Sequence, residues 1–88
     1  MFEVLLHKNV AKGLKKLDTG HLKKTARVIE LLEKDPYPWK RCDLKKIKGA
    51  EDTYRIRIGM YRVVYYIEKE RKRIHILKLE TREKVYNK

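Results

Sequence analysis

Three arginines, Arg55, Arg57 and Arg62, lie within one short segment and carry the clearest chemical signal in this chain. From Tyr54 to Tyr66 the segment alternates apolar and charged residues, which is the period of β-strands with one buried face. A guanidinium group keeps its charge and presents a rigid fork of N–H donors that matches phosphate oxygens. The arginines therefore indicate either a phosphate site or a solvated polar strand face, and the residue pattern leaves both interpretations open.

The alternation is interrupted at Gly59 and Met60, which predicts a two-residue hairpin, because glycine suits the first position of a type II′ turn. The facing pairs are then Ile58 with Tyr61, Arg57 with Arg62, and Arg55 with Val64. The expected core face carries Tyr54, Ile56, Ile58, Tyr61, Val63, Tyr65 and Ile67, and the three arginines share the other face. Like charges directly opposite one another, with Cβ atoms about 4.5–5.5 Å apart, destabilise a strand pair. A bound anion would relieve the repulsion between Arg57 and Arg62.

Size and charge narrow the classes of function. The chain has 88 residues, which we expect to form a single domain over residues 1–88, and 24 Lys and Arg against 12 Asp and Glu give a formal charge of +12. This excess favours a polyanionic partner, which can be nucleic acid, an anionic membrane surface or an acidic protein. No run of about 18 apolar residues is present to span a membrane. The first residues lack the pattern of a signal peptide, so we expect a cytoplasmic location.

Other catalytic groups are poorly placed. His7, His21 and His75 are far apart in the sequence and lack metal-ligand spacing. The single Cys42 excludes an internal disulfide, and nothing around it matches a cysteine hydrolase. The chain has no serine to act as a nucleophile and no glycine-rich phosphate loop. We therefore expect neither a metal nor a cofactor.

The elements before the arginine segment are predicted from apolar periodicity. We expect a first strand over residues 2–6 and then a helix capped by Asn9. Thr19 is the expected cap of a second helix, which Asp35 and Pro36 end because the residue before proline avoids the helical region. The predicted apolar face of this helix carries Leu22, Ala26, Ile29 and Leu32, with Val28 and Leu31 widening it.

The remaining elements complete an α+β fold. Residues 36–52 are expected to form an irregular basic connector, in which Leu44 and Ile47 give an anchor or a short edge strand. A last strand is expected over residues 73–79, with Leu77 and Leu79 facing away from Ile74 and Ile76, which indicates a central or bulged strand. A polar tail then carries Arg82 and Tyr86. The predicted order is an N-terminal strand, an antiparallel helix hairpin and a mostly antiparallel curved sheet.

Clustered arginines suit RNA cleavage without a metal, because the ribose 2′-OH lies beside the phosphate and can attack it. The protein must then orient the hydroxyl, neutralise charge on the phosphorus oxygens and stabilise the leaving 5′-oxygen. Arginines perform the second task well but transfer protons poorly, since their pKa exceeds about 12. Binding of a phosphate backbone without cleavage needs only the positive charge.

The segment from Tyr54 to Tyr65, with Leu-Lys-Lys-Ile-Lys-Gly at residues 44–49, resembles the RelE/ParE superfamily of toxins from bacterial and archaeal toxin–antitoxin pairs. Thr-Arg-Glu-Lys-Val-Tyr at residues 81–86 is similar to the C-terminal arginine and tyrosine positions of that family. The resemblance covers nearly the whole chain. It implies a RelE-like toxin that cleaves messenger RNA in the ribosomal A site without a metal.

The resemblance also implies residue roles. Arg62 would contact the scissile phosphate and stabilise its transition state. Arg57 and Arg55 match positions that are often lysine in the family, and we assign both to electrostatics rather than to proton abstraction. Arg82 would act on the phosphate or the leaving group, and Tyr86 would stack on or orient the substrate nucleotide.

The partners implied by the resemblance are an antitoxin, the ribosome and messenger RNA. An acidic or amphipathic antitoxin would wrap the toxin and cover the arginines, and operator DNA would be contacted only through the toxin–antitoxin complex. Ribosomal RNA would meet basic residues of the connector, which are Lys40, Arg41, Lys45, Lys46 and Lys48. Their number predicts salt-sensitive binding.

Two other functions are compatible with the same residues. One is a ParE-like inhibitor that binds DNA gyrase without cutting RNA, against which the set Arg57, Arg62, Arg82 and Tyr86 argues. The other is a basic RNA- or DNA-binding module without catalysis, which the absence of the family's lysine base keeps open.

Overall fold

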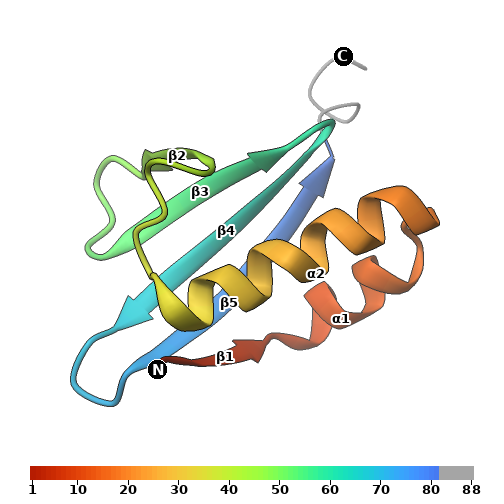
Figure 1. Cartoon of the computed structure of the whole chain (residues 1–88). Helices are drawn as coiled ribbons and strands as arrows, with labels where there is room; N and C mark the ends of the chain where they lie inside the picture. The colour runs from red at the N-terminus through yellow and green to blue at the C-terminus, as the bar shows by residue number, and fades with distance from the viewer. Residues whose placement is uncertain (82–88) are drawn as a thin grey trace.

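The computed structural model describes residues 1–81 and places them in one sheet and two helices (Figure 1). The elements are β1 (Glu3–Leu6), α1 (Lys8–Lys15), α2 (Thr19–Lys34), β2 (Asp43–Lys46), β3 (Thr53–Ile58), β4 (Tyr61–Glu68) and β5 (Arg73–Thr81). The strand order is β1-β5-β4-β3-β2, in which β1 runs parallel to β5 and every other pair is antiparallel. The expected α+β fold with a mostly antiparallel sheet is confirmed, and the short edge strand is β2.

The β3–β4 hairpin has the register that the alternation predicts. Its facing pairs include Ile58 with Tyr61, Arg57 with Arg62, and Arg55 with Val64. Gly59 has a φ of 59°, and Met60 is not among the residues with positive φ, as a type II′ turn requires. A side chain at Gly59 would be strained by this φ, and its Cβ would come within 3.3 Å of the His21 ring on α2.

One face of the sheet packs against the helices and forms the core. Its buried strand residues are Leu44, Ile56, Ile58, Val63, Tyr65, Ile67, Ile74 and Ile76, and they meet Val10 of α1 and Leu32 of α2. The prediction of this face is confirmed, although Tyr54 and Tyr61 at its margins are only partly buried. Tyr65 is fully buried, and its hydroxyl donates a 2.8 Å hydrogen bond to the carbonyl of Pro36, so its one polar atom has a partner.

The helix starts differ from the predictions. The first helix begins at Lys8 after His7, which makes no side-chain cap, and Asn9 lies inside the helix. The second helix is capped by Asp18, whose carboxylate accepts a 2.9 Å bond from the His21 amide, and Thr19 is the first helical residue. Asp and Thr are both favoured as helix caps. Asp18 is the cap here because its carboxylate reaches the free amide of His21.

The buried face of α2 is rotated from the predicted one. Thr25 and Leu32 are buried and Val28 packs against the core, whereas Leu22 and Ala26 are exposed. Thr25 is tolerated inside because its hydroxyl donates to the carbonyl of His21 at 2.8 Å. A stripe drawn from apolar residues alone leaves this buried threonine out, so the predicted face differs from the observed one.

Strand β5 is central and bulged. Its pairing with β4 shifts between Val64, which faces Lys78, and Tyr65, which faces Ile76. The extra residue is Leu77, and the bulge returns Leu79 to the core side, where it packs against the buried cluster. The prediction that Leu79 faces away from the core is therefore wrong, and β5 continues to Thr81 instead of ending before a tail.

Both helices lie on the core side of the sheet, so within residues 1–81 no helix covers the other side (Figure 1). We call this uncovered side the open face. Neither helix in the described part of the chain is long and apolar enough to cross a membrane.

Candidate functional site

The predicted arginine pair lies in a row of four charged residues that crosses the open face. Asp43 on β2 is paired with Arg57 on β3, Arg57 with Arg62 on β4, and Arg62 with Glu80 on β5. We call these four residues the arginine row. Its two cations occupy the middle strands, and a carboxylate stands at each end. The prediction that the arginines share a face away from the core is confirmed.

Arg57 is held by the carboxylate beside it. Its Nε lies 3.2 Å from Asp43 Oδ2, and both side chains are about half exposed, at 45% and 49%. An ion pair so open to water contributes at most about 1 kcal/mol to stability. Its effect on orientation is more important, since it restrains one guanidinium next to Arg62. The repulsion that an anion was expected to relieve is thus partly offset by Asp43 within the chain.

A second row, next to the first on the same face, extends the positive surface. Lys45 on β2 faces Arg55 on β3, Arg55 faces Val64 on β4, and Val64 faces Lys78 on β5. Two predicted RNA-binding residues, Lys45 and Arg55, therefore lie beside the arginine row. Lys78 joins them and was not predicted. Within this row no acidic residue is paired with the cations, so it adds attraction for a phosphate backbone.

The other predicted RNA-binding residues are not paired within the two rows. Lys40 and Arg41 are exposed in the connector just before β2. Lys46 is paired with Tyr54 and therefore lies on the core side of the sheet. Lys48 lies in the turn between β2 and β3. The four cations are thus spread over the connector, β2 and the β2–β3 turn.

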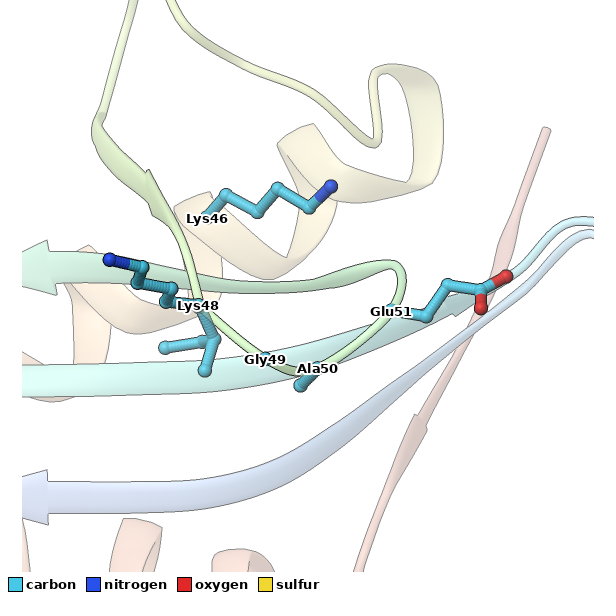
Figure 2. A pocket seen from close by; sticks show the side chains of 6 residues that line it. Lys46, Lys48, Gly49, Ala50 and Glu51 are labelled. Carbon is cyan, nitrogen blue, oxygen red and sulfur yellow. The ribbon is translucent and has the colours of Figure 1, made fainter.

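The β2–β3 turn encloses an open hollow of about 560 Å³, lined by residues 46–51. Figure 2 shows Lys46, Lys48 and Glu51 pointing in different directions around it, so no group of donors converges there. The turn precedes Thr53, and Arg57 is four residues further along β3, which is roughly 13 Å in a strand. We therefore place the candidate site at the arginine row and not in this hollow.

Arg82 and Tyr86, the predicted C-terminal site residues, lie outside the described residues. The last described residue, Thr81, is paired with Tyr61, and the preceding Glu80 is paired with Arg62. The strand therefore leads the chain past the arginine row as far as Thr81. Glu80 occupies a place in the row that sequence reasoning missed.

The remaining reactive groups within residues 1–81 do not form a catalytic set. Burial raises the pKa of the Cys42 thiol, which makes it a poor nucleophile. Burial also raises the pKa of the Tyr65 hydroxyl, which stays protonated as a core hydrogen-bond donor. No three His, Cys, Asp or Glu side chains among these residues are placed to hold a metal ion.

Asp43 and Glu80 are the site residues that were missed, and a signal for Asp43 was present. Leu44 was expected to anchor an edge strand, and alternation then turns Asp43 towards the open face. Glu80 could not be placed in the same way, because the bulge at Leu77 changes which residues of β5 face outwards.

Comparisons with known proteins agree with this fold. Residues 4–86 match the family model of the ParE toxin of the type II toxin–antitoxin system parDE. The chain is 41% identical over 85 residues to the RelE1 protein of Methanocaldococcus jannaschii, covering 97% of this chain and 94% of that protein.

Solved structures give the same result. The archaeal RelE–RelB complex from Pyrococcus horikoshii OT3 contains a chain with a TM-score of 0.85 and 37% identity, with 92% of this chain and 94% of that chain covered. The RelB–RelE antitoxin–toxin complex from Methanococcus jannaschii contains one with a TM-score of 0.79 and 28% identity, with 94% and 95% covered.

Proposed function

This chain belongs to the RelE/ParE family of toxins of type II toxin–antitoxin systems, and from this premise we propose that it is a ribosome-dependent endoribonuclease. It cleaves messenger RNA without a metal and so stops translation. The observation that carries the proposal is the facing pair Arg57 and Arg62 on the open face. Two arginines at facing positions of neighbouring strands can both bind the non-bridging oxygens of one phosphate.

The proposed reaction needs a nucleophile that RNA itself supplies. The 2′-oxygen attacks the adjacent phosphorus, the O2′–P bond forms and the P–O5′ bond breaks. The 2′-OH proton passes to a base or to water, and the 5′-oxygen leaves with a proton. Arg62 stabilises the charge that builds on the phosphorus oxygens, and Arg57, restrained by Asp43, supports it. Neither arginine acts as the base, because a guanidinium does not release its proton near neutral pH.

Four further assignments complete the site and the RNA path. Arg82 acts on the phosphate or the leaving 5′-oxygen, and Tyr86 orients the nucleotide, as the family pattern implies. Lys45 and Arg55 bind the backbone next to the scissile phosphate, and their place beside the arginine row supports this. The separate cations Lys40, Arg41, Lys46 and Lys48 contact ribosomal RNA, and binding therefore weakens steeply with salt.

The partner that neutralises this activity is an antitoxin. The matched chains from Pyrococcus horikoshii and Methanococcus jannaschii were solved in complexes with RelB. For this chain, an acidic or amphipathic antitoxin suits the charge of +12 and covers the open face. We assign residues 1–88 to one toxin domain that acts in the cytoplasm and contacts operator DNA only through the antitoxin complex.

One observation favours a second candidate, a binding module without catalysis. Each arginine of the arginine row is paired with a carboxylate, Asp43 or Glu80, which lowers the positive potential where the phosphate would sit. Such a module binds RNA and leaves it intact.

The chemistry of the cleaved ends tests the proposal. The chain is incubated with ribosomes programmed with a defined message, and the RNA ends are analysed. We expect a 2′,3′-cyclic phosphate or 3′-phosphate on one fragment and a 5′-OH on the other. A message with a 2′-deoxy sugar at the cleaved position is the control and stays intact. Fragments with 5′-phosphates contradict the mechanism, and RNA that is bound but uncut identifies the binding module.

A further inference from the structure

A second cluster of side chains lies on the open face, towards the other end of β4. Its residues border an open hollow of about 450 Å³ and are His7, Tyr66, Glu68, Arg71, Arg73, His75 and Leu77. None of them was assigned a role from the sequence. The cluster combines three aromatic rings with two arginines, which is the composition of a surface that contacts unpaired bases.

The rings of the cluster are arranged around His75. The Tyr66 and His75 rings have centroids 5.9 Å apart and are inclined by only 33°, whereas the His7 ring meets His75 edge-on at 5.8 Å. Tyr66 is 37% exposed, so part of its ring faces the solvent. Tyr66 and His75 are directly paired across β4 and β5. We call these two residues the aromatic platform.

Polar contacts hold the platform in place. His75 Nε2 lies 3.0 Å from Glu68 Oε1, and Arg71 Nε lies 3.6 Å from the other oxygen of the same carboxylate. A second ion pair joins Arg73 Nε to Glu3 at 3.4 Å. Leu77, the bulged residue of β5, borders the hollow, and bulges of this kind re-aim side chains next to functional sites. These contacts restrain the His75 ring that lies beside Tyr66.

The platform is continuous with the arginine row. Arg62, Val64 and Tyr66 are alternate residues of β4, so all three face the open side. The distance along the strand from Arg62 to Tyr66 is roughly 13 Å, since each residue advances about 3.3 Å. Arg55 and Lys78 flank Val64 between the two sites. An extended strand of RNA with its phosphate at Arg62 can pass these cations and reach Tyr66.

We propose that the aromatic platform binds an unpaired nucleobase of the RNA strand whose phosphate lies at the arginine row. The base stacks on the exposed ring of Tyr66, which His75 backs. Because Arg62 and Tyr66 lie roughly 13 Å apart along β4, the stacked base belongs to a nearby nucleotide and not to the cleaved one. Stacking accepts any base, so the platform adds affinity and alignment and not a sequence code. This inference rests on the proposed function for the identity of the strand.

Binding of a non-cleavable strand tests the platform. A short single-stranded RNA with 2′-O-methyl sugars and a fluorescent end is titrated with the chain, and anisotropy gives Kd at fixed salt. We expect Tyr66→Ala to weaken binding by about fivefold to 150-fold, the range for loss of one stacked base. Trp39→Ala is the matched control, since Trp39 is 56% exposed but lies in the connector, in edge contact with Tyr54. We expect the Kd of Trp39→Ala for this RNA to equal that of wild type.

A second strand separates stacking from other effects. In a set of otherwise identical RNA strands, each strand has one base removed at a different position. We expect wild type and Tyr66→Ala to bind with equal Kd only to the strand that lacks the stacked base. Tyr66→Leu, which keeps an apolar side chain but no ring, weakens binding like Tyr66→Ala, and circular dichroism confirms that both variants fold. Unchanged RNA binding by folded Tyr66→Ala or Tyr66→Leu overturns the platform. An equal loss on every abasic strand also overturns it.

The outcome also distinguishes this inference from the proposed function. If messenger RNA is cleaved but binding ignores Tyr66, the nuclease stands and the platform fails. If binding depends on Tyr66 and on Arg62 but no RNA is cut, the platform stands and the nuclease fails. If Tyr66→Ala weakens only the complex with an antitoxin peptide, the hollow is an antitoxin contact and the platform is wrong.

Discussion

The two faces of the β3–β4 hairpin are built from alternate residues of the same strands, yet they have opposite properties. On the core face Ile56, Val63 and Tyr65 are between 0% and 2% exposed. On the open face Arg57 and Arg62 meet side by side, and one of them is half exposed in its ion pair with Asp43. Stability therefore depends mainly on one face, whereas the proposed chemistry depends on the other.

The comparison also shows how the core positions the site. Side chains alternate with a period of two, so a slip of one residue would move the arginines into the core. The burial of Ile56 opposite Val63 thus fixes the register that brings Arg57 opposite Arg62. The arginines gain their position without contributing to it, and substitutions on the two faces should have separable effects.

Tyr65→Ala gives the largest expected change, because it removes a fully buried ring and its bond to the Pro36 carbonyl. We expect the free energy of unfolding to fall by about 3–5 kcal/mol, as for other buried aromatic residues. Denaturant titration followed by circular dichroism measures the loss. The neighbouring Tyr66→Ala, on the open face, is the control and should cost about 1 kcal/mol or less. Similar losses for both tyrosines would break the distinction between the faces.

Asp43→Asn should change activity more than stability. It removes the carboxylate that restrains Arg57 and leaves two arginines facing each other. We expect kcat for cleavage to fall by up to about fivefold, since such a pair holds its guanidinium by at most about 1 kcal/mol. The KM for RNA should not rise, because the variant carries less negative charge beside the phosphate. A rise in KM with unchanged kcat would mean that Asp43 does not position Arg57.

Glu68→Gln should have the smallest effect on stability, present near neutral pH and absent in acid, where the wild-type carboxylate is itself protonated. The hydrogen bond from His75 lowers the pKa of the Glu68 carboxyl below its usual 4.5. The carboxylate therefore stabilises the fold above about pH 4.5, and this contribution is lost as the pH falls through the lowered value. Between about pH 6 and about pH 3, the thermal stability of wild type should fall by more than that of Glu68→Gln. Parallel curves for the two proteins would show that the pairing with His75 adds nothing.

Local patterns predicted the hairpin but not its neighbours. The alternation and Gly59 were enough for the β3–β4 register, because turn and strands are contiguous in the sequence. The parallel pairing of β1 with β5 joins segments about seventy residues apart, and no turn fixes that register. The second helix start was missed by one residue, since Asp and Thr are both good caps, and the first by two, because that helix begins after His7 without a side-chain cap.

In the candidate site, too, the sequence predicted the residues of the hairpin but not the carboxylates of the outer strands. Arg55, Arg57 and Arg62 were found because they share one strand pair. Asp43 and Glu80 come from outer strands, whose registers depend on the β2–β3 turn and on the bulge at Leu77. Alternation around Leu44 indicates only that Asp43 faces outwards, so its pairing with Arg57, and the whole placement of Glu80, had to come from the fold.

The most direct test of the account compares wild type with Arg62→Ala on programmed ribosomes, with the stability of both proteins measured in parallel. Loss of one donor to a charged transition state predicts that the cleavage rate falls by roughly 10² to 10³. Unfolding should change by less than about 1 kcal/mol, because Arg62 lies on the open face. Arg27→Ala, which removes the same charge from the exposed surface of α2, should cleave like wild type. Full cleavage by Arg62→Ala, or a loss of cleavage explained by unfolding, would contradict the assignment of the chemistry to the arginine row.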